Sequence, residues 1–286
     1  MRSDNYAPVG HAGARETDVA SGLRFKFGAN WRAFLKSVDE SRVQQAEASL
    51  QQMLDTSHLH GMRILDVGCG SGLFSLAARR LGATVRSFDF DPDAVAAAEE
   101  LKRRFAPGDA LWTIETGSAL DRRYLDGLGQ FDLVYAFGVL HHTGAMWEAL
   151  ENMAPLVKPG GKLFVSIYND QGKPSQRWWW IKRTYNRLPP PLRFLVLWMS
   201  ALWLWWRPML KDFLLLHPFR TWRGYLHQRG MSPWHDLVDW VGGFPFEVAK
   251  PEQVFDFYRR RGFSLERLVT RGGSFGCNQF LLRKCE

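Results

Sequence analysis

The fold of this 286-residue chain is decided by one stretch, Arg63-Ile64-Leu65-Asp66-Val67-Gly68-Cys69-Gly70-Ser71-Gly72. Its first five residues predict a buried strand, because a short and mostly apolar run ends at glycines. Apolar residues then recur at helical spacing from Leu73 until Gly82 ends the helix. Glycines at a strand-to-helix turn let a ligand approach the backbone and leave the first amide groups of the helix free to bind it. The stretch therefore predicts a ligand-binding loop at the carboxyl end of a strand.

Short apolar runs alternate with helical patterns beyond this loop. Further strands are predicted at residues 84–88, 112–116, 131–136 and 162–168, and the alternation resumes after residue 250 with a helix and strands at 263–270 and 277–282. Alternating strands and helices are typical of a parallel sheet. The last two strands are joined by a short turn at Gly272-Gly273, so they must be antiparallel to each other. The pattern predicts an α/β fold with a seven-stranded sheet.

The segment 171–230 interrupts this alternation and has a composition of its own. It carries eleven Lys and Arg residues and one acid, Asp212, which gives it a net charge of +10 in a chain of net charge +8. It also holds eight of the thirteen tryptophans. We interpret it as a basic helical insertion after the fifth strand, at the end of the sheet where ligands bind. The expected divisions are an N-terminal helical arm (1–60), a core (61–168), the insertion (169–250) and a core completion (251–286).

Cysteine usage and hydropathy bound the location of the protein. Cys69, Cys277 and Cys285 are too few and too scattered for a disulfide framework, and the first residues lack a signal-peptide pattern. The longest apolar run, residues 194–206, would span roughly 20 Å as a helix, which is less than the ~30 Å hydrocarbon core of a bilayer. We expect a cytoplasmic protein without a transmembrane helix. No cysteine or histidine spacing matches a metal site, so no metal is expected.

Asp89 adds a second signal to the glycine loop. It ends the strand at 84–88, where a carboxylate can accept both hydrogen bonds of a ribose diol. With the ordered motifs LDVGCGSG (65–72), GSAL (117–120), FDLVYAF (131–137) and LVKPGG (156–161), the chain resembles a class I S-adenosylmethionine-dependent methyltransferase of the small-molecule type, similar to ubiquinone-biosynthesis O-methyltransferases. The resemblance covers roughly residues 61–168 and 251–286. It implies a Rossmann-like methyltransferase sheet, with an antiparallel last strand and a helical lid after strand five.

The resemblance also implies a binding site for S-adenosylmethionine. By this likeness, Asp66 and the glycines 68, 70 and 72 hold the methionine part of the cofactor, and Asp89 holds its ribose. The adenine is expected against Phe90, Ser118 and Ala119, and the floor of the site against Phe137. Relatives often carry an aspartate where Ser118 stands, so the contact with the adenine amino group departs from the family pattern.

Methyl transfer requires that the acceptor, the methyl group and the sulfur are aligned and that the acceptor is a free nucleophile. A hydroxyl acceptor needs a base to remove its proton, whereas a thiol needs only modest help. His141 and His142 follow the fourth strand, and the resemblance to small-molecule O-methyltransferases falls on His142. We predict His142 as the base or acceptor-orienting residue, with His141 and Tyr168 beside it; a backbone-bonded histidine at a helix start is the alternative.

Several interpretations stay open at this point. The preferred function is methylation of a hydroxyl on an aromatic or lipid-like small molecule. Methylation of a small thiol or hydrosulfide is the alternative within the same chemistry, and a non-catalytic adenosyl-ligand-binding or membrane-interaction protein is the alternative outside it. The insertion is interpreted as a lid, as a peripheral membrane surface through 171–230 at the inner face of the membrane, or as both. A nucleic-acid partner is disfavoured, because the residues after the fourth strand are Ala136-Phe137-Gly138-Val139. The sequence does not determine the oligomeric state.

Overall fold

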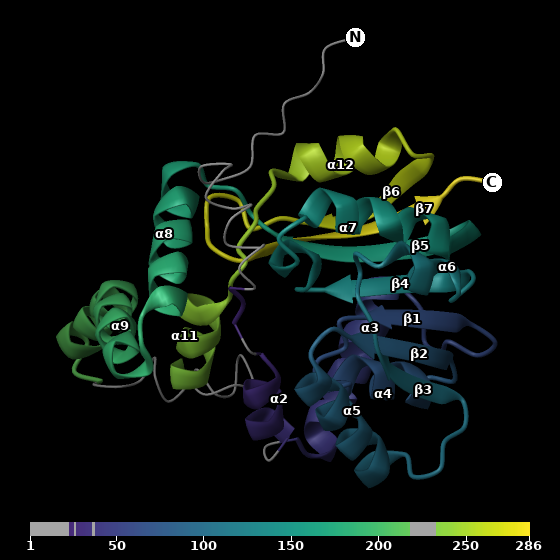
Figure 1. Cartoon of the computed structure of the whole chain (residues 1–286), viewed down its shortest axis with the longest axis horizontal. Coiled ribbons are helices and arrows are strands. Elements are labelled where there is room, and N and C mark those ends of the chain that lie inside the picture. The colour runs from purple at the N-terminus through teal and green to yellow at the C-terminus, as the bar shows by residue number, and fades with distance from the viewer. Residues whose placement is uncertain (1–22, 26, 36–37, 218–232) are drawn as a thin grey trace. The chain divides into compact units, whose positions relative to one another are not determined.

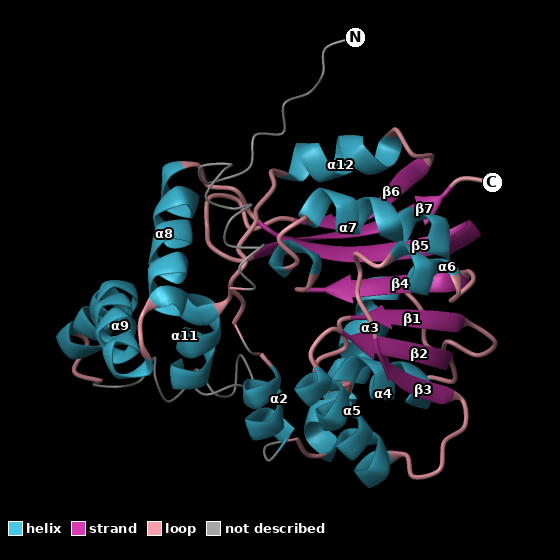
Figure 2. Cartoon of the chain, in the orientation of Figure 1, coloured by secondary structure: helices cyan, strands magenta, loops and turns pink. Residues whose placement is uncertain are grey.

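The computed structural model describes residues 23–25, 27–35, 38–217 and 233–286. Its strands form one seven-stranded sheet in the order β3-β2-β1-β4-β5-β7-β6 (Figures 1 and 2). The strands are β1 (Arg63–Val67), β2 (Thr84–Asp89), β3 (Trp112–Thr116), β4 (Phe131–Phe137), β5 (Val157–Tyr168), β6 (Phe263–Val269) and β7 (Cys277–Lys284). β1 to β5 are parallel, while β7 is antiparallel to both β5 and β6. The predicted seven-stranded Rossmann-like sheet with an antiparallel last strand is confirmed.

Helices connect the strands. They are α2 (Gly28–Leu35), α3 (Glu40–Leu54), α4 (Leu73–Arg80), α5 (Pro92–Phe105), α6 (Arg122–Asp126), α7 (Met146–Met153), α8 (Lys173–Arg187), α9 (Pro190–Leu214), α11 (Pro233–Gly242) and α12 (Pro251–Arg259), with single 3₁₀ turns at Leu140–His142 and Ala154–Leu156. Among the helices of the described residues, none combines the length and the apolarity that a membrane span requires.

Strand alternation divides the apolar core between the two faces of the sheet. Leu65 on β1 belongs to a buried cluster with Met146 of α7 and Val254 of α12. Its neighbour Ile64 belongs to a second cluster, with Leu76 of α4 and residues of α3 and α5. Because successive side chains of a strand point to opposite faces, one short apolar run supplies both cores.

The order of the strands locates a ligand crevice. The chain moves outward from β1 to β2 and β3 and then crosses back to pair β4 with the other side of β1. Successive strands are thus added on one side of β1 and then on the other. The carboxyl ends of β1 and β4 flank the point where this order reverses, which is where open α/β sheets bind ligands.

Strand β5 corrects one predicted boundary. Its expected start was Lys162, after a turn, but the strand begins at Val157. Phe131 pairs with Val157 while Leu133 pairs with Lys162, so the intervening residues bulge within the strand and do not end it. A bulge uses the same turn-forming residues as a loop, and local sequence does not separate the two.

The described residues form two compact units. One holds the sheet and comprises residues 27–175 and 247–286, apart from the gap at 36–37; the other comprises 23–25, 176–217 and 233–246. In the second unit, the ring of Trp178 on α8 lies 5.4 Å from that of Trp203 on α9, and the amide of Asn186 donates to the carbonyl of Gly242 over 2.7 Å. The segment between β5 and α12 is thus a helical insertion. That it covers the acceptor pocket stays a prediction.

Candidate functional site

The glycine loop between β1 and α4 is held to the end of β2 by its own backbone. The amides of Gly68 and Cys69 both donate to the carbonyl of Phe88, over 2.8 and 3.1 Å. Gly70 has a φ of 54°, which lies in the left-handed region that residues with a side chain rarely adopt. A Cβ at Gly68 would stand 2.4 Å from a methyl carbon of Val139, so the loop after β4 lies directly on this glycine.

Asp89 connects the end of β2 to this loop. One of its carboxylate oxygens accepts a hydrogen bond from the amide of Gly70 and the other accepts one from the amide of Asp91, each over 2.9 Å. Burial raises the pKa of the Asp89 carboxyl, and these amide hydrogen bonds oppose that rise. A carboxylate has about four lone-pair sites, so it can accept from further donors beside these amides.

Asp66 points into the interior of the sheet unit. Its carboxylate is buried and accepts a 2.5 Å hydrogen bond from the hydroxyl of Ser75 on α4. The Ser75 hydroxyl also lies 2.8 Å from that of Ser87, which accepts the indole N–H of Trp112 over 2.9 Å. Burial raises the pKa of Asp66 to about 7; the Ser75 hydrogen bond lowers it and the charge of Asp89 adds to the rise. No pattern in the sequence predicts this chain of buried polar side chains behind the glycine loop.

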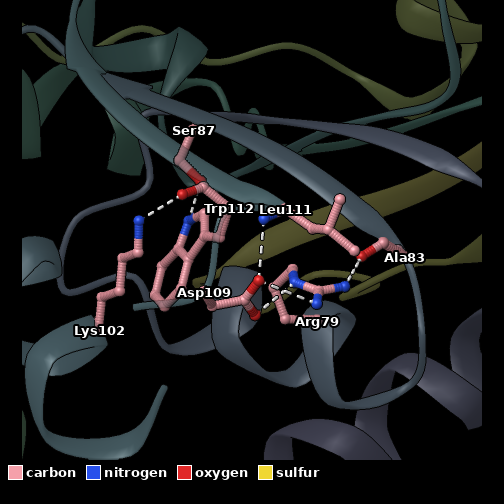
Figure 3. A network of polar contacts seen from close by, with 7 residues as sticks. All are labelled: Arg79, Ala83, Ser87, Lys102, Asp109, Leu111 and Trp112. Atoms are coloured by element: carbon pink, nitrogen blue, oxygen red, sulfur yellow. Dashed lines mark hydrogen bonds and ion pairs between the residues drawn. The ribbon is translucent and has the colours of Figure 1, made fainter. Parts of the chain in front are cut away.

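Trp112 begins the edge strand β3, and polar contacts surround it there (Figure 3). The ammonium of Lys102 donates to its carbonyl over 2.5 Å. Next to it, Arg79 of α4 forms a bidentate ion pair with Asp109, with N–O distances of 2.8 and 3.1 Å, and Asp109 also accepts from the amide of Leu111. These contacts fix α4, whose first turn follows the glycine loop.

The predicted adenine-side residues lie at the ends of β2 and β3. Phe90 is 58% exposed. The carbonyl of Asp89 accepts from the amide of Gly117 over 3.0 Å, which brings the two strand ends together. The Ser118 hydroxyl accepts from the amide of Leu120 over 3.2 Å, and the carbonyl of Ala119 accepts from Asn152.

Phe137 ends β4 in a stack of aromatic rings. Its ring is nearly parallel to those of Tyr135 and Phe164, with centroid distances of 6.2 and 6.1 Å, and it lies 5.7 Å from Phe74 of α4. Phe137 is 43% exposed at the strand end, so the stack presents a hydrophobic surface there.

The three predicted catalytic side chains gather after β4 and β5. The ring of His142 lies 4.4 Å from that of His141 and 5.4 Å from that of Tyr168, and the ring of Phe27 lies 5.1 Å from His142. His141 is fully buried, with its ring 4.0 Å from Tyr168, whereas His142 and Tyr168 are half-buried. Of the two histidines, His142 is therefore the accessible one.

Glu247 supports this histidine turn from far along the chain. Its carboxylate is buried and accepts from the amide of Met146 at the start of α7 over 2.9 Å. Its own amide donates to the carbonyl of His141 over 3.0 Å. Sequence reasoning missed Glu247, although an acid inside the apolar run 244–249 was a usable signal.

Helix α2 lies against the glycine loop. A Cβ at Gly70 would stand 2.8 Å from the indole ring of Trp31, and the amide of Gly28 donates to the carboxylate of Asp91 over 2.9 Å. Trp31 and Phe27 thus bring aromatic rings to the glycine loop and to His142. Over the described ranges, no group of three or more His, Cys, Asp or Glu side chains could hold a metal ion.

Comparison with known proteins assigns this arrangement to a family. The model of a methyltransferase domain matches residues 38–235. The ubiquinone biosynthesis O-methyltransferase of Xanthomonas euvesicatoria is 36% identical over 118 residues, which cover 39% of this chain and 45% of that protein. The chain thus spans about half the length of the curated relatives it matches.

Solved structures show the same fold. The magnesium protoporphyrin IX methyltransferase from Synechocystis PCC 6803 with bound SAM has a TM-score of 0.53 at 14% identity, over 94% of this chain and 97% of that one. A 1,6-didemethyltoxoflavin-N1-methyltransferase from Burkholderia thailandensis with bound S-adenosylhomocysteine has a TM-score of 0.50 at 15% identity, over 100% and 99% of the two chains. With a family model that matches most of its length, the chain belongs to the methyltransferase domain family.

Proposed function

We propose that the protein transfers a methyl group from S-adenosylmethionine to a hydroxyl of an aromatic or lipid-like small molecule. The observation that supports this proposal best is the hydrogen bond from the amide of Gly70 to the carboxylate of Asp89. It places a carboxylate beside a glycine-rich loop, at the point where the order of the strands in the sheet reverses. S-adenosylmethionine, when bound, supplies an electrophilic methyl group on a sulfonium.

The residues at the strand ends fit this cofactor. In the proposal, the carboxylate of Asp89 accepts from the ribose hydroxyls, and the backbone at glycines 68, 70 and 72 admits the methionine part. The exposed ring of Phe90, with Ser118 and Ala119, borders the adenine, and Phe137 forms the floor. The sequence places Asp66 on the methionine part; we propose instead that it supports the loop from behind, because its carboxylate accepts the hydroxyl of Ser75.

Trp31 completes the site from α2. Its indole lies against Gly70, so an aromatic ring borders the loop. Aromatic faces attract cations, and a sulfonium is one. We assign Trp31 to the binding of the charged end of the cofactor.

His142 takes the proton of the acceptor. As the acceptor oxygen forms its bond to the methyl carbon, the carbon–sulfur bond breaks and a ring nitrogen of His142 accepts the hydroxyl proton, so that the products are a methyl ether and S-adenosylhomocysteine. His141 and Tyr168 pack against this ring and set its orientation, while Phe27 adds an aromatic wall. A hydroxyl acceptor agrees with the O-methyltransferase named among the relatives.

The proposal is tested by identifying the product. Purified protein is incubated with S-adenosylmethionine carrying a labelled methyl group and a panel of phenols, quinols and small thiols, and the labelled product is analysed by mass spectrometry. We expect a methyl ether from a phenol or quinol. A thioether as the only product would favour the thiol alternative, and binding of S-adenosylhomocysteine without turnover on any acceptor would favour a non-catalytic protein.

A further inference from the structure

Helix α9 exposes an apolar surface that the chemistry above does not use. Its 25 residues bury only a narrow stripe, marked by Leu197, Ala201 and Asp212. The opposite side is apolar and exposed along the whole helix, and we call it the apolar face of α9. The face includes Leu195, Met199, Leu202, Trp206, Met209 and Phe213.

The apolar face is wide and continuous. At ~100° per residue, these six side chains fall on one side of the helix, and no charged residue interrupts them. Met199 is 72% exposed and Phe213 is 71% exposed. A surface helix normally turns its apolar side toward the core, so a helix that turns the larger apolar side outward marks an interaction site.

The charges around the face have one sign. Arg207 and Lys211 lie one turn apart on the same helix, outside the apolar face, and the guanidinium of Arg207 lies 5.2 Å from the centre of the Trp206 ring. α8 carries no acid, and the single acid of α9, Asp212, is buried. Within the described parts of these two helices, the surface therefore offers exposed cations and no exposed carboxylate.

An open apolar hollow lies on the last turns of α9. It has a volume of about 420 Å³ and is lined by Trp206, Arg207, Leu210, Lys211, Leu214 and Leu215. The exposed walls of the hollow are almost wholly apolar, and the charged ends of Arg207 and Lys211 lie outside it. This part of α9 therefore complements a molecule with an acyl chain and an anionic head. Anionic lipids have this chemistry, whereas the buried centre of a protein–protein interface is depleted of charge.

We propose that the apolar face of α9 docks on a bilayer that contains anionic lipids. The helix lies in the plane of the membrane surface, with Leu202, Trp206 and Phe213 at the level of the acyl chains. Trp198 and Trp203, which are exposed at the two margins of the face, lie at the headgroups. Arg207 and Lys211 bind lipid phosphates. Apolar and tryptophan-rich faces bordered by Lys and Arg are typical of helices that bind this interface without crossing it. This proposal does not depend on the methyl-transfer chemistry.

The experiment is flotation of the full chain with vesicles in a density gradient. Vesicles of phosphatidylcholine alone are compared with vesicles that also contain phosphatidylglycerol, at low and at high salt. We expect the protein to float with the anionic vesicles at low salt and to be released as salt rises, because screening weakens the attraction of its cations. Failure of the wild-type protein to float with anionic vesicles at low salt would overturn the proposal.

Variants locate the binding surface. The double variant Leu202→Glu with Phe213→Glu should reduce the vesicle-bound fraction at least about tenfold, since two charges would enter the apolar layer. Arg207→Gln and Lys211→Gln should each weaken binding roughly fivefold. Leu111→Glu is the matched control, because Leu111 is an exposed leucine of the sheet unit, and it should float like the wild type. Binding of S-adenosylhomocysteine and the circular dichroism spectrum report whether each variant is folded.

Two outcomes would contradict this location. Flotation of the double glutamate variant at the wild-type level would show that another surface binds lipid. A wild-type dimer that does not float, and that the same double variant dissociates, would show that a second copy of this chain covers the face; light scattering after gel filtration measures this.

Discussion

The hydroxyl of Ser75 donates a 2.5 Å hydrogen bond to the buried carboxylate of Asp66, directly behind the glycine loop. The pair joins α4 to β1 through side chains, at the same end of β1 where the backbone leaves the strand. Burial raises the pKa of Asp66 to about 7, compared with 3.8 for a free aspartate.

The first prediction concerns pH. Because folded Asp66 keeps its proton to higher pH than the unfolded chain does, this carboxyl lowers the free energy of unfolding as pH rises from about 4 to about 7. Asp66→Asn keeps an acceptor for Ser75 and cannot ionise. The stability of this variant relative to wild type should therefore increase across that window, which urea unfolding at a series of pH values measures. If the free energies of unfolding of the two proteins changed in parallel with pH, the raised pKa of the buried Asp66 carboxyl would be contradicted.

The second prediction separates backbone strain from site geometry. Gly70→Ala and Gly108→Ala both put a side chain at a positive φ, 54° and 72°, and each should lose about 1–2 kcal/mol of unfolding free energy. Only at Gly70 does the new Cβ meet another group, the indole of Trp31; around Gly108 there is open space. Calorimetry should therefore find weaker S-adenosylhomocysteine binding in Gly70→Ala alone. Equal binding by both variants would argue against the loop as the binding site.

The third prediction concerns the base. His142→Gln should lower kcat for a hydroxyl acceptor by about 100-fold or more, because it removes the proton acceptor. Binding of S-adenosylhomocysteine should stay within about twofold of wild type, since the proposal places His142 on the acceptor. His58→Gln, an exposed histidine after α3, is the control and should keep full activity. Unchanged kcat in His142→Gln would leave the ring without a role in proton transfer.

The fourth prediction tests the support from Glu247. Its carboxylate accepts the amide of Met146, so Glu247→Met leaves that amide unsatisfied and should cost about 1–3 kcal/mol of stability. Glu247→Gln retains an acceptor oxygen and should cost less. Glu148→Gln serves as the control, because Glu148 is exposed on α7, the helix that begins at Met146. This variant should change thermal unfolding little. Equal losses for the Met and Gln variants would show that the hydrogen bond is not what matters.

The sheet could be predicted because its signals are local. The run at residues 63–67 carries apolar side chains on both faces, and the structure divides Ile64 from Leu65 and Val67 between two cores, as a parallel strand with helices on both sides requires. The antiparallel pairing of β6 and β7 followed from the short turn between them. The start of β5 could not be predicted, since whether Gly160 and Gly161 end a strand or bulge within it depends on pairing with Phe131 and Leu133.

The candidate site also contains one residue that could be predicted and one whose orientation could not. Asp89 could be found from its place at a strand end, and its contact with Gly70 lies there. The direction of the Asp66 side chain could not, because it depends on Ser75 and Ser87, which lie on two other elements. Contacts between residues distant in sequence leave no periodic signal in either segment.

The central claim is that Asp89 and the glycine loop together bind the adenosyl cofactor, and isothermal titration calorimetry with S-adenosylhomocysteine tests it most directly. We predict saturable binding to the wild-type protein that weakens about 100-fold in Asp89→Ala, since two hydrogen bonds to a charged group would be lost. Asp126→Ala, an exposed aspartate at the end of α6, should bind like wild type. No binding to the wild-type chain, or equal binding by Asp89→Ala, would contradict the claim.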